Sequence, residues 1–418
     1  MSKPVISRTI TGYNLHWEPE QIKIDVSRIR ESKVSTLAEL LITCAAPGLS
    51  SPHIKQTTFS LTTNDARPKL ARELNKIYGA EWDVILEQLC VNVLKEIRRG
   101  EPVVILGAFG SQVKPPEYLL EPYIIRNQPN VFFGEPGAAK TTWGLIMASI
   151  LTLGNWHDNP ARLPVHEKPE RCLWLDWETD RSVIDWQLDC IRRGLGFGET
   201  PYEIFYRRCS TPLADDLEQI KQAIDEYRAT IIFIDSLGLA CGGDLNSAEP
   251  ALRFFSSYRQ LDTTSVILAH TARNTEVNNK HVYGSMFFEA QARNIWEVVK
   301  SADEDNSIVV GMYHKKPPPF GKLHKPLGYK FTFDNESNET YFEWHDPKSV
   351  DDLLERMGAN DRILGLLKTG PKTPKEIQTE LSINQSTARS SIKRLKDKAL
   401  IVALNEGKYG LSVPTNLL

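Results

Sequence analysis

The first hundred residues show two different spacings of apolar side chains. Up to about residue 63, short runs such as residues 22–26 alternate apolar and polar positions, as a β-strand with one buried face does. Over residues 65–99 the apolar side chains recur at helical spacing, with a break at Gly79. The pattern predicts a small N-terminal α+β domain over residues 1–107, and no catalytic motif falls within it.

The middle of the chain alternates short apolar runs with helical stretches. The expected pairs of strand and helix cover residues 131–133 and 141–153, 171–176 and 180–193, 230–235 and 249–261, and 265–270 and 271–295. Such alternation is typical of an α/β fold, in which helices cover both faces of a parallel sheet. Two later apolar runs, residues 308–312 and 329–333, are expected to extend the sheet as hairpins at its edge.

Proline-rich and acidic segments divide the chain. Prolines over residues 114–122 predict a linker at residues 108–124 without regular structure, because proline has no backbone N–H to donate. A weakly patterned acidic stretch predicts a second linker at residues 346–359. The α/β domain is thereby placed at residues 125–345.

The last segment, residues 360–418, has a helical pattern of its own. A first helix stops at Gly370, and residues 373–376 form a capping box with proline at the first helical position. A third helix begins near Gln385, and two short strands pair around residues 405–407. The order is similar to that of a winged helix-turn-helix domain, whose third helix enters the major groove of duplex DNA. Such domains also dock onto proteins, and the sequence leaves both uses open.

Charge is unevenly distributed along the 418 residues. The whole chain carries −3, whereas residues 360–418 hold ten Lys and Arg against five Asp and Glu, which is +5 and leaves −8 for residues 1–359. The basic segment indicates an anionic partner, nucleic acid before membrane. No apolar run reaches about 18 residues and no apolar signal segment follows Met1, so we expect a soluble cytoplasmic protein without membrane contact. The six cysteines include no Cys-x-x-Cys pair, which argues against a disulfide framework or a zinc site.

A glycine-containing turn follows the first apolar run of the α/β segment and opens its first helix. Glycines let backbone N–H groups converge on phosphate oxygens, and the helix N-terminus adds partial positive charge. Lys140 is placed to reach the β and γ phosphates, and the Thr141 hydroxyl to ligate Mg²⁺. The residues expected to bind the nucleotide are Gly134, Glu135, Pro136, Gly137, Ala138, Ala139, Lys140, Thr141, Thr142 and, on a later strand, Asp235. The sequence therefore predicts binding of ATP with Mg²⁺.

Ala139 departs from the usual phosphate loop, which has glycine before the lysine. A Cβ at this position can crowd the phosphates. The loop is similar to the Gly-x-Pro-Gly-x-Ala-Lys-Ser loops of minichromosome-maintenance helicases, which hydrolyse ATP. We therefore interpret Ala139 as tolerated.

Two of the apolar strands lead to carboxylates. Asp235 ends one of them and is the expected Walker B residue, which holds Mg²⁺ beside Thr141; an aspartate that caps the following turn is the alternative. Another strand leads to Asp176 and Glu178. A general base must reach the attacking water, so a carboxylate at the carboxyl edge of the sheet is the candidate. Glu178 is preferred, and Asp176, which lies deeper on the same face, is the runner-up.

Five short motifs occur in an order found in one branch of ATPases. They are Gly-Glu-Pro-Gly-x-x-Lys-Thr, Leu-Trp-Leu-Asp-Trp-Glu, Ile-Phe-Ile-Asp-Ser-Leu-Gly, Val-Ile-Leu-Ala-His-Thr, and Tyr-Gly-Ser followed by Ala-Arg-Asn-Ile-Trp. On these motifs residues 120–335 resemble the RepA-type branch of the RecA-fold P-loop ATPases, which includes hexameric replicative helicases of plasmids. The resemblance implies a RecA-like core, ATP hydrolysis and assembly as a hexamer.

The resemblance also implies roles for individual side chains. Glu178 matches the glutamate that polarises the attacking water. His270 occupies the position that senses the γ-phosphate, with a hydrogen-bonded histidine at the edge of the core as the alternative. Arg293 matches the arginine that reaches the neighbouring subunit's nucleotide as a finger, and a surface salt bridge is its alternative. Lys315 and Lys316 are alternative cations for that task.

Two loops, residues 241–246 and 273–281, leave the strand tips. The second carries Arg273, Lys280 and His281, which suit contacts with the backbone of single-stranded DNA, or it is an ordinary solvated loop. Together these features favour an ATP-driven DNA helicase or translocase in DNA replication or repair, working as a hexameric ring. The alternatives are an ATP-switched DNA-binding or recruiting ATPase and a recombinase-like filament without strand separation.

Overall fold

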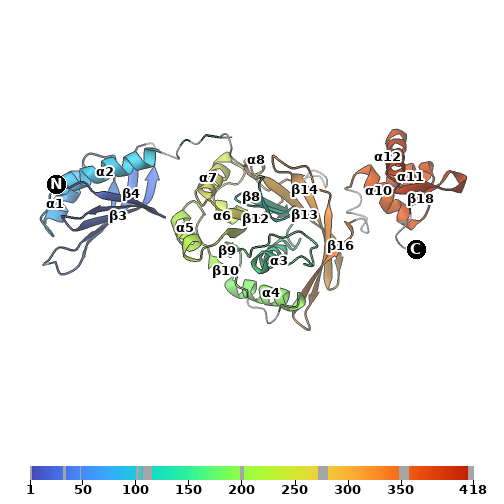
Figure 1. Cartoon of the computed structure of the whole chain (residues 1–418), viewed down its shortest axis with the longest axis horizontal. Helices are drawn as coiled ribbons and strands as arrows, with labels where there is room; N and C mark the ends of the chain where they lie inside the picture. Colours follow the sequence, from blue (N-terminus) through green and yellow to red (C-terminus); the bar gives the residue numbers. More distant parts are fainter. Residues whose placement is uncertain are drawn as a thin grey trace. The chain divides into compact units, whose positions relative to one another are not determined.

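The computed structural model contains two compact units (Figure 1). It describes residues 2–31, 34–47, 49–99, 103, 105–106, 115–197, 202–271, 281–347 and 357–412. The units comprise Met1–Pro115 with Asp216–Glu226, and Pro116–Asp215 with Tyr227–Leu418. Arg273 and Lys280, two of the residues expected to contact single-stranded DNA, lie outside the described residues, as do parts of both expected linkers.

The first unit, as far as it is described, has a five-stranded antiparallel sheet with its strands in chain order. Its elements are β1 (Val5–Thr9), β2 (Gly12–Trp17), β3 (Ile22–Glu31), β4 (Thr36–Cys44), β5 (His53–Ser60), α1 (Ala66–Asn75), α2 (Trp82–Arg99) and α5 (Leu217–Glu226). Alternation along β3 buries Ile22, Ile24 and Val26 in one core with the apolar faces of α1 and α2. Helix α5 comes from the middle of the chain, whereas the sequence pattern placed its residues in the α/β domain.

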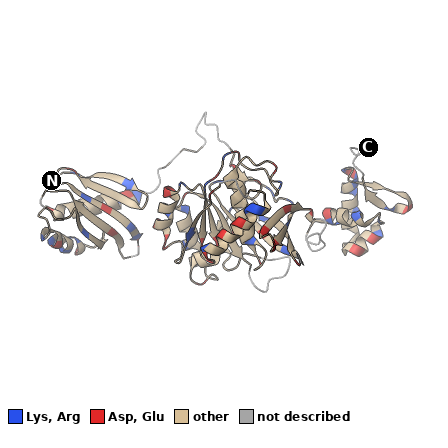
Figure 2. Ribbon diagram, turned by 90° about the horizontal axis from the view of Figure 1, so that it is seen from below, with Lys and Arg blue, Asp and Glu red and all other residues tan. Residues whose placement is uncertain are grey.

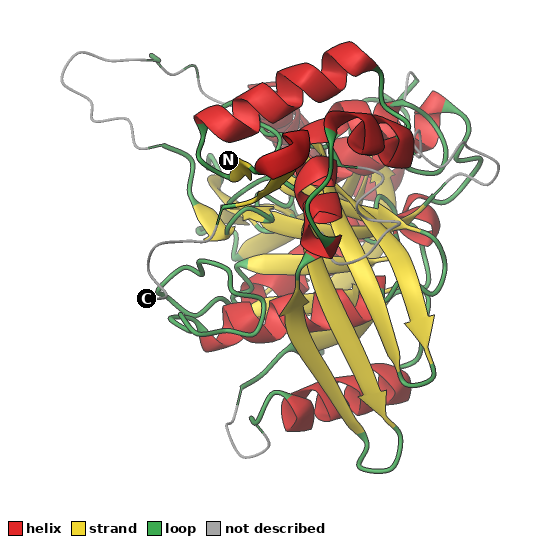
Figure 3. Ribbon diagram, turned by 90° about the vertical axis from the view of Figure 1, so that its right-hand side faces the viewer, coloured by secondary structure: helices red, strands yellow, loops and turns green. Residues whose placement is uncertain are grey.

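A nine-stranded sheet runs through the described part of the second unit (Figures 1 and 3). The strand order is β10-β9-β11-β12-β8-β13-β14-β15-β16, parallel from β10 to β13 and antiparallel from there on. The strands are β8 (Pro129–Gly134), β9 (Cys172–Asp176), β10 (Phe205–Arg208), β11 (Ile231–Asp235), β12 (Thr264–His270), β13 (Asn294–Glu304), β14 (Ser307–Lys316), β15 (Leu327–Asp334) and β16 (Glu339–His345). The helices are α3 (Lys140–Leu153), α4 (Arg181–Gly194), α6 (Leu237–Cys241), α7 (Ala248–Arg259) and α8 (Phe287–Gln291). The predicted α/β fold with a parallel sheet is confirmed, while β10, β13 and β16 were not foreseen as strands.

Helix α3 packs against the middle of this sheet. It is buried along almost its whole length, so it is apolar on all sides rather than amphipathic. A Cβ at Gly144 would lie 2.8 Å from the Trp174 ring, so the glycine allows close approach of helix and sheet. Trp174 in turn stacks on Phe233 of the next strand, with ring centroids 5.3 Å apart. Despite such apolar stretches, none of the described helices has the length and hydropathy of a membrane span.

The prediction that residues 108–124 form a linker without regular structure is wrong for the second half of that segment. Strands β6 (Tyr118–Leu120) and β7 (Ile124–Ile125) pair there. Tyr123 between them is fully buried, with its ring centroid 5.4 Å from that of Trp143 and 4.4 Å from that of Trp296. Proline excludes regular hydrogen bonding only at its own position, and the apolar residues between the prolines are held by burial in the core.

The described C-terminal residues form helices and a short hairpin around a small core of their own. The elements are α10 (Ala359–Leu366), a 3₁₀ turn (Leu367–Thr369), α11 (Pro374–Leu381), α12 (Gln385–Asp397), β17 (Ile401–Ala403) and β18 (Tyr409–Leu411). The predicted capping box is present: the Thr373 hydroxyl accepts from the Glu376 N–H, and the Glu376 carboxylate accepts from the Thr373 N–H. Asn384 caps α12 by accepting from the Thr387 N–H at 2.8 Å.

A buried histidine locks the antiparallel edge to the segment that follows β14. The His324 N–H donates to His314 Nδ1 at 2.9 Å, so Nε2 carries the proton of the neutral ring and donates to Asn294 Oδ1 at 2.7 Å. The ring also stacks on Trp296, with centroids 4.3 Å apart. Burial lowers the pKa of His314 to about 4, because the charged ring has no water around it.

His314 therefore predicts a loss of stability in mild acid. The unfolded chain takes up a proton at this histidine near pH 6.5, and the folded chain does so only near pH 4, so folding is disfavoured as the pH falls through that window. Between pH 7 and pH 5 the free energy of unfolding should drop by about 2 kcal/mol more in the wild type than in His314→Gln. Urea titrations followed by tryptophan fluorescence measure the difference, and equal drops in both proteins would contradict the assignment.

Candidate nucleotide site

The phosphate loop joins the carboxyl end of β8 to the start of α3. Gly137 has φ +76°, a conformation that favours glycine. Lys140 is buried, and its ammonium donates to the carbonyl oxygens of Gly134 at 2.9 Å and Glu135 at 2.8 Å. Burial lowers the pKa of Lys140, while the carboxylates of Asp235 and Glu178 oppose that shift. The loop thus holds a lysine ammonium where a phosphate group can exchange with the two carbonyls.

Ala139 occupies the position at which a phosphate loop usually has glycine. It caps α3 in the left-handed conformation, with φ +54° and ψ 32°, which costs an alanine about 1 kcal/mol. Its side chain packs against the main core of the second unit. The methyl group therefore gains contacts that offset part of the strain, which supports the interpretation that alanine is tolerated.

Thr141 and Asp235, the two expected magnesium ligands, are in contact. The Thr141 hydroxyl donates to Asp235 Oδ2 at 2.8 Å. Burial raises the pKa of Asp235 to about 7; the Thr141 hydrogen bond and Lys140 lower it, and Glu178 and Asp176 raise it further. The hydroxyl and the carboxylate are hard oxygen donors, which Mg²⁺ prefers. The buried carboxylate also lacks, among the described residues, a neighbouring charge that neutralises it, so the pair fits Mg²⁺.

Asp176 and Glu178 have different surroundings. Asp176 is fully buried, and its carboxylate accepts from the N–H of Glu178 at 2.8 Å, from the N–H and hydroxyl of Thr179 at 2.9 and 3.0 Å, and from the hydroxyl of Tyr206 at 3.0 Å. These bonds shape the turn between β9 and α4. Glu178 keeps 43% of its side chain exposed, and the neighbouring His270 lowers its pKa, which favours the ionised form that a general base needs.

His270 lies at the carboxyl end of β12, next to the phosphate-loop strand. Its Nε2 is 3.6 Å from Glu178 Oε2, so the expected sensor and the expected base are neighbours. Its Nδ1 is buried and has no hydrogen-bond partner among the described residues. A histidine with a purely structural role at the edge of the core would have its ring nitrogens hydrogen-bonded. His270 leaves Nδ1 without a partner among the described residues and lies beside the expected base.

Arg293, Lys315 and Lys316, the three candidates for a cation that acts on a neighbouring subunit, have different surroundings. The Arg293 N–H donates to the Pro129 carbonyl at the amino end of β8, and the strand's six residues span about 20 Å from there to the phosphate loop. The Lys316 ammonium donates to the carbonyls of Glu289, Ala290 and Ala292 at 2.6, 3.1 and 2.8 Å. Lys315 pairs with Glu297 at 3.4 Å. Glu297 lies beside Phe133 of β8, so Lys315 is nearer the phosphate loop than Arg293 is, but its charge is paired within the chain.

Gly284 and Ser285, which follow the second strand-tip loop, lie against the first loop at Leu245. The Ser285 N–H donates to the Leu245 carbonyl at 2.7 Å, and a Cβ at Gly284 would meet the same carbonyl oxygen at 2.5 Å. His281, expected to face single-stranded DNA, has its Nδ1 3.0 Å from a carboxylate oxygen of Glu289. Because the Glu289 carboxylate already occupies this ring nitrogen, His281 is less suited to bind a phosphate.

Three side chains near the site were missed in the sequence. Thr179 and Tyr206 hold Asp176, and no motif signals a second-layer partner of this kind. Trp186 on α4 is 54% exposed and lines a cavity of about 70 Å³ with Thr142, next to the phosphate loop. An exposed tryptophan eight residues after the expected base was the available signal.

Comparison with known proteins bears on the phosphate-loop region directly. Residues 96–276 match the family model described as the AAA domain. The match covers less than half of the chain and includes the phosphate loop, so this part of the chain is similar to that family of ATPase domains. The match ends before β13, so it does not include the antiparallel edge or the C-terminal helices.

Solved structures and curated proteins add little to that match. One similar structure is a KaiC-like protein from the hyperthermophilic archaeon Pyrococcus horikoshii OT3, with 14% identity and a TM-score of 0.35, covering 56% of this chain and 98% of that one. The search of curated proteins returned no match.

The geometry predicts different outcomes for two neighbouring carboxylates. Asp176→Asn should lower the free energy of unfolding by about 1–3 kcal/mol, because an amide replaces half of a buried acceptor that serves four donors. Glu178→Gln should stay within about 0.5 kcal/mol of the wild type, since that side chain is half-exposed. Urea unfolding of both variants measures this, and a larger loss for Glu178→Gln would reverse the roles.

Proposed function

We propose that the chain is a RecA-fold DNA helicase or translocase of the RepA-type branch that hydrolyses ATP with Mg²⁺. The observation that carries the proposal is the cluster at the carboxyl edge of the parallel sheet: Lys140, the Thr141–Asp235 pair, and Glu178 beside His270. Phosphoryl transfer needs an electropositive cradle, a magnesium ligand set and a positioned base, and each has a candidate here.

The proposed reaction uses these side chains in turn. Lys140 and the loop N–H groups hold the β and γ phosphates, with phosphate oxygens replacing the carbonyls that the ammonium now contacts. Mg²⁺ bound at Thr141 and Asp235 supplies positive charge against the charge that develops on the phosphates. Glu178 accepts a proton from water as the water oxygen bonds to the γ-phosphorus, and ADP leaves with the electrons of the broken P–O bond. His270 contacts Glu178, so loss of the γ-phosphate can be transmitted to the end of β12.

The recess beside α3 is the proposed position of the adenine base. Thr142 lines it on the side of the phosphate loop, and Trp186 offers an aromatic face. Gln187, Asn335 and Asn338 also line the recess and carry amides that can hydrogen-bond to a base. An aromatic surface with a few polar groups is the usual composition of a nucleotide-base pocket.

A homo-oligomer, in the leading reading a hexameric ring, is part of the proposal. Arg293 is exposed and lies at the edge of the sheet opposite its own phosphate loop. As an arginine finger it therefore acts only on a neighbour's nucleotide, which makes hydrolysis depend on assembly. Lys315 and Lys316 are less suited to that task because each is engaged in its own chain.

The C-terminal helices are proposed to be a winged helix-turn-helix domain that binds duplex DNA. Lys375, Arg389, Lys393 and Lys396 line one groove of about 860 Å³ beside Tyr409 of β18. Figure 2 shows both charge types on this part of the chain, and the groove lining itself contains only cations among its charged residues. Phosphate backbones bind such surfaces with a steep salt dependence.

Hydrolysis is tested first. Lys140→Ala should lose nucleotide binding, whereas Glu178→Gln should bind a fluorescent ATP analogue normally and turn ATP over about 10²–10⁴-fold more slowly, because only proton transfer is removed. Lys168→Ala, an exposed lysine on another loop, is the control for loss of charge. ATP-dependent separation of a labelled forked DNA duplex then tests the helicase assignment. A wild-type protein that hydrolyses ATP but separates no strands would favour the recruiting ATPase or the filament.

The C-terminal groove generates a separate prediction. Arg389→Ala with Lys393→Ala should weaken duplex binding and reduce the slope of log K against log salt by about 2, because two phosphate contacts are lost. The matched control is Arg394→Ala with Lys398→Ala, which removes equal charge outside the groove lining. Fluorescence anisotropy without nucleotide measures both, and equal losses in the two variants would remove the groove as the binding face.

A further inference from the structure

The amino edge of the parallel sheet carries a cavity of its own, here called the amino-edge cavity. It measures about 270 Å³, and its lining comes from the ends of β8 and α7 and from the residues before β12 and β13. Arg259 and Arg293 are its cations, and Asp262 is its only acidic lining residue. A small polar cavity with two guanidinium groups suits a phosphate-sized anion.

The two arginines have different settings. A guanidinium nitrogen of Arg259 donates to the side-chain oxygen of Gln291, another lining residue, which orients the group from the end of α7. Arg293 is exposed, and its guanidinium makes no hydrogen bond or ion pair with the described side chains. Lys316 adds positive charge nearby: burial lowers its pKa, and the charge of Arg293 lowers it further. Arg259 and Arg293, with Lys316 nearby, thus outnumber Asp262 in the lining and Glu289 beside Lys316.

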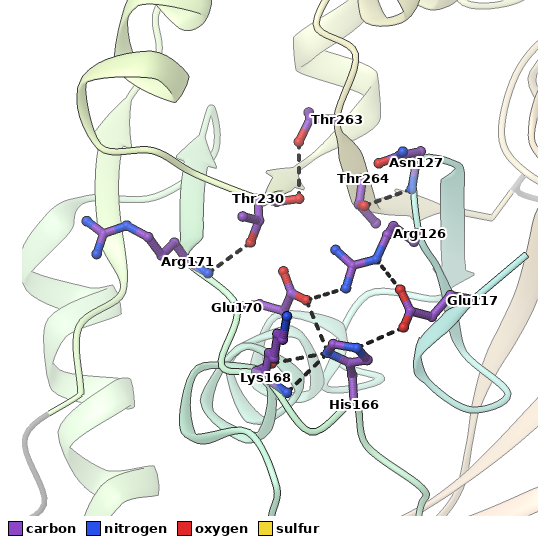
Figure 4. Close-up of polar contacts among 10 residues, drawn as sticks. All are labelled: Glu117, Arg126, Asn127, His166, Lys168, Glu170, Arg171, Thr230, Thr263 and Thr264. Carbon is purple, nitrogen blue, oxygen red and sulfur yellow. Dashed lines mark hydrogen bonds and ion pairs between the residues drawn. The ribbon is translucent and has the colours of Figure 1, made fainter.

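The walls of the cavity are held by a polar network (Figure 4). The Asn127 N–H donates to the Thr264 hydroxyl at 2.8 Å, and the Thr263 hydroxyl donates to the Thr230 carbonyl at 3.2 Å. The buried Tyr258 hydroxyl also donates to the Thr263 carbonyl, at 2.7 Å. The cavity walls therefore need little reorganisation to receive a ligand.

The residue before Asn127 is fixed by charge. The Arg126 guanidinium donates to the carboxylates of Glu117 at 2.6 Å and of buried Glu170 at 2.8 Å. His166 lies 2.8 Å from Glu117 and completes the cluster. Figure 4 shows both carboxylates turned toward the Arg126 guanidinium, which holds the chain just before Asn127.

We propose that the amino-edge cavity binds the terminal phosphate of a nucleotide held by a second copy of this chain, with Arg259 as a second cation beside Arg293. The inference rests on the proposed ATPase function and names a residue that the sequence motifs did not. Charge complementarity selects the occupant: the carboxyl edge of a copy has the exposed carboxylate of Glu178 and, under the proposed function, would hold a triphosphate, whereas this edge presents arginines. Contact between two different edges is a head-to-tail interface, the kind that closes rings or extends filaments.

The test uses full-length Arg259→Ala, Arg259→Lys and Arg253→Ala. Arg253 lies on the same helix but outside the cavity lining and is the matched control. We expect Arg259→Ala to lower kcat by about 10–100-fold with little change in KM, since a trans cation acts mainly in the transition state. Arg259→Lys should recover part of the rate, and Arg253→Ala should equal the wild type. A rate for Arg259→Ala within twofold of the wild type would overturn the proposal.

Mixed oligomers separate action in trans from a structural role. Arg259→Ala mixed with Glu178→Gln should hydrolyse ATP faster than either protein alone, because some interfaces then join an intact base to an intact arginine. Absence of this gain, in mixtures that assemble as the wild type does, would contradict the proposal. Gln291→Ala removes the hydrogen bond of Arg259 but keeps its charge, so it should lose less than Arg259→Ala. Equal losses would contradict a direct role for the charge of Arg259.

Other sources of phosphate give different results. If the cavity bound free phosphate, inorganic phosphate would inhibit the wild type more than Arg259→Ala; if it bound nucleic acid, the variant would lose DNA affinity rather than kcat. Either result would overturn the proposal. A wild-type protein without ATPase activity would instead refute the proposed function itself, so the two failures are distinguishable.

Discussion

The parallel register of β9, β11, β12 and β8 is the constraint on which the candidate site depends. In this register Asp176 pairs with Asp235, and His270 pairs with Gly134, so strand ends that are far apart in sequence arrive at one edge. A shift of one residue along any strand would turn its last side chain to the other face of the sheet. The buried apolar runs of these strands fix the register, and the arrangement of the candidate site follows from core packing.

At the carboxyl edge of the sheet, the buried charged groups are not fully neutralised by the other described groups of the chain. Asp235 is buried beside other carboxylates, which is why its pKa rises toward neutrality, and the pKa of Lys140 is lowered by the same burial. Under the proposed function, a divalent cation would supply the positive charge that Asp235 lacks, and a triphosphate would supply the negative charge that Lys140 lacks. The burial of these two groups, which costs stability, would then favour binding of a metal–nucleotide pair.

Much of the fold and the site could be predicted because each depends on local signals. The order of turn, Lys140 and Thr141 is a contiguous motif, and Asp235 ends an apolar strand. The features that the sequence did not predict depend on tertiary contacts. Strands β6 and β7 form in a proline-rich stretch because Tyr123 is buried among aromatic rings from α3 and β13. The choice between Asp176 and Glu178 likewise needed the donors that surround Asp176, which no spacing reveals.

The chain has a chemical polarity that runs along its parallel strands. Carboxylates and the phosphate loop lie at the carboxyl ends, and Arg259, Arg293 and Lys316 gather at the amino ends about 20 Å away. A single copy cannot bring these groups together, because β8 lies between them as a rigid strand in the core. Copies stacked head to tail can do so at every interface. In such an assembly the length of the strand couples nucleotide chemistry at one edge to the position of the neighbour at the other.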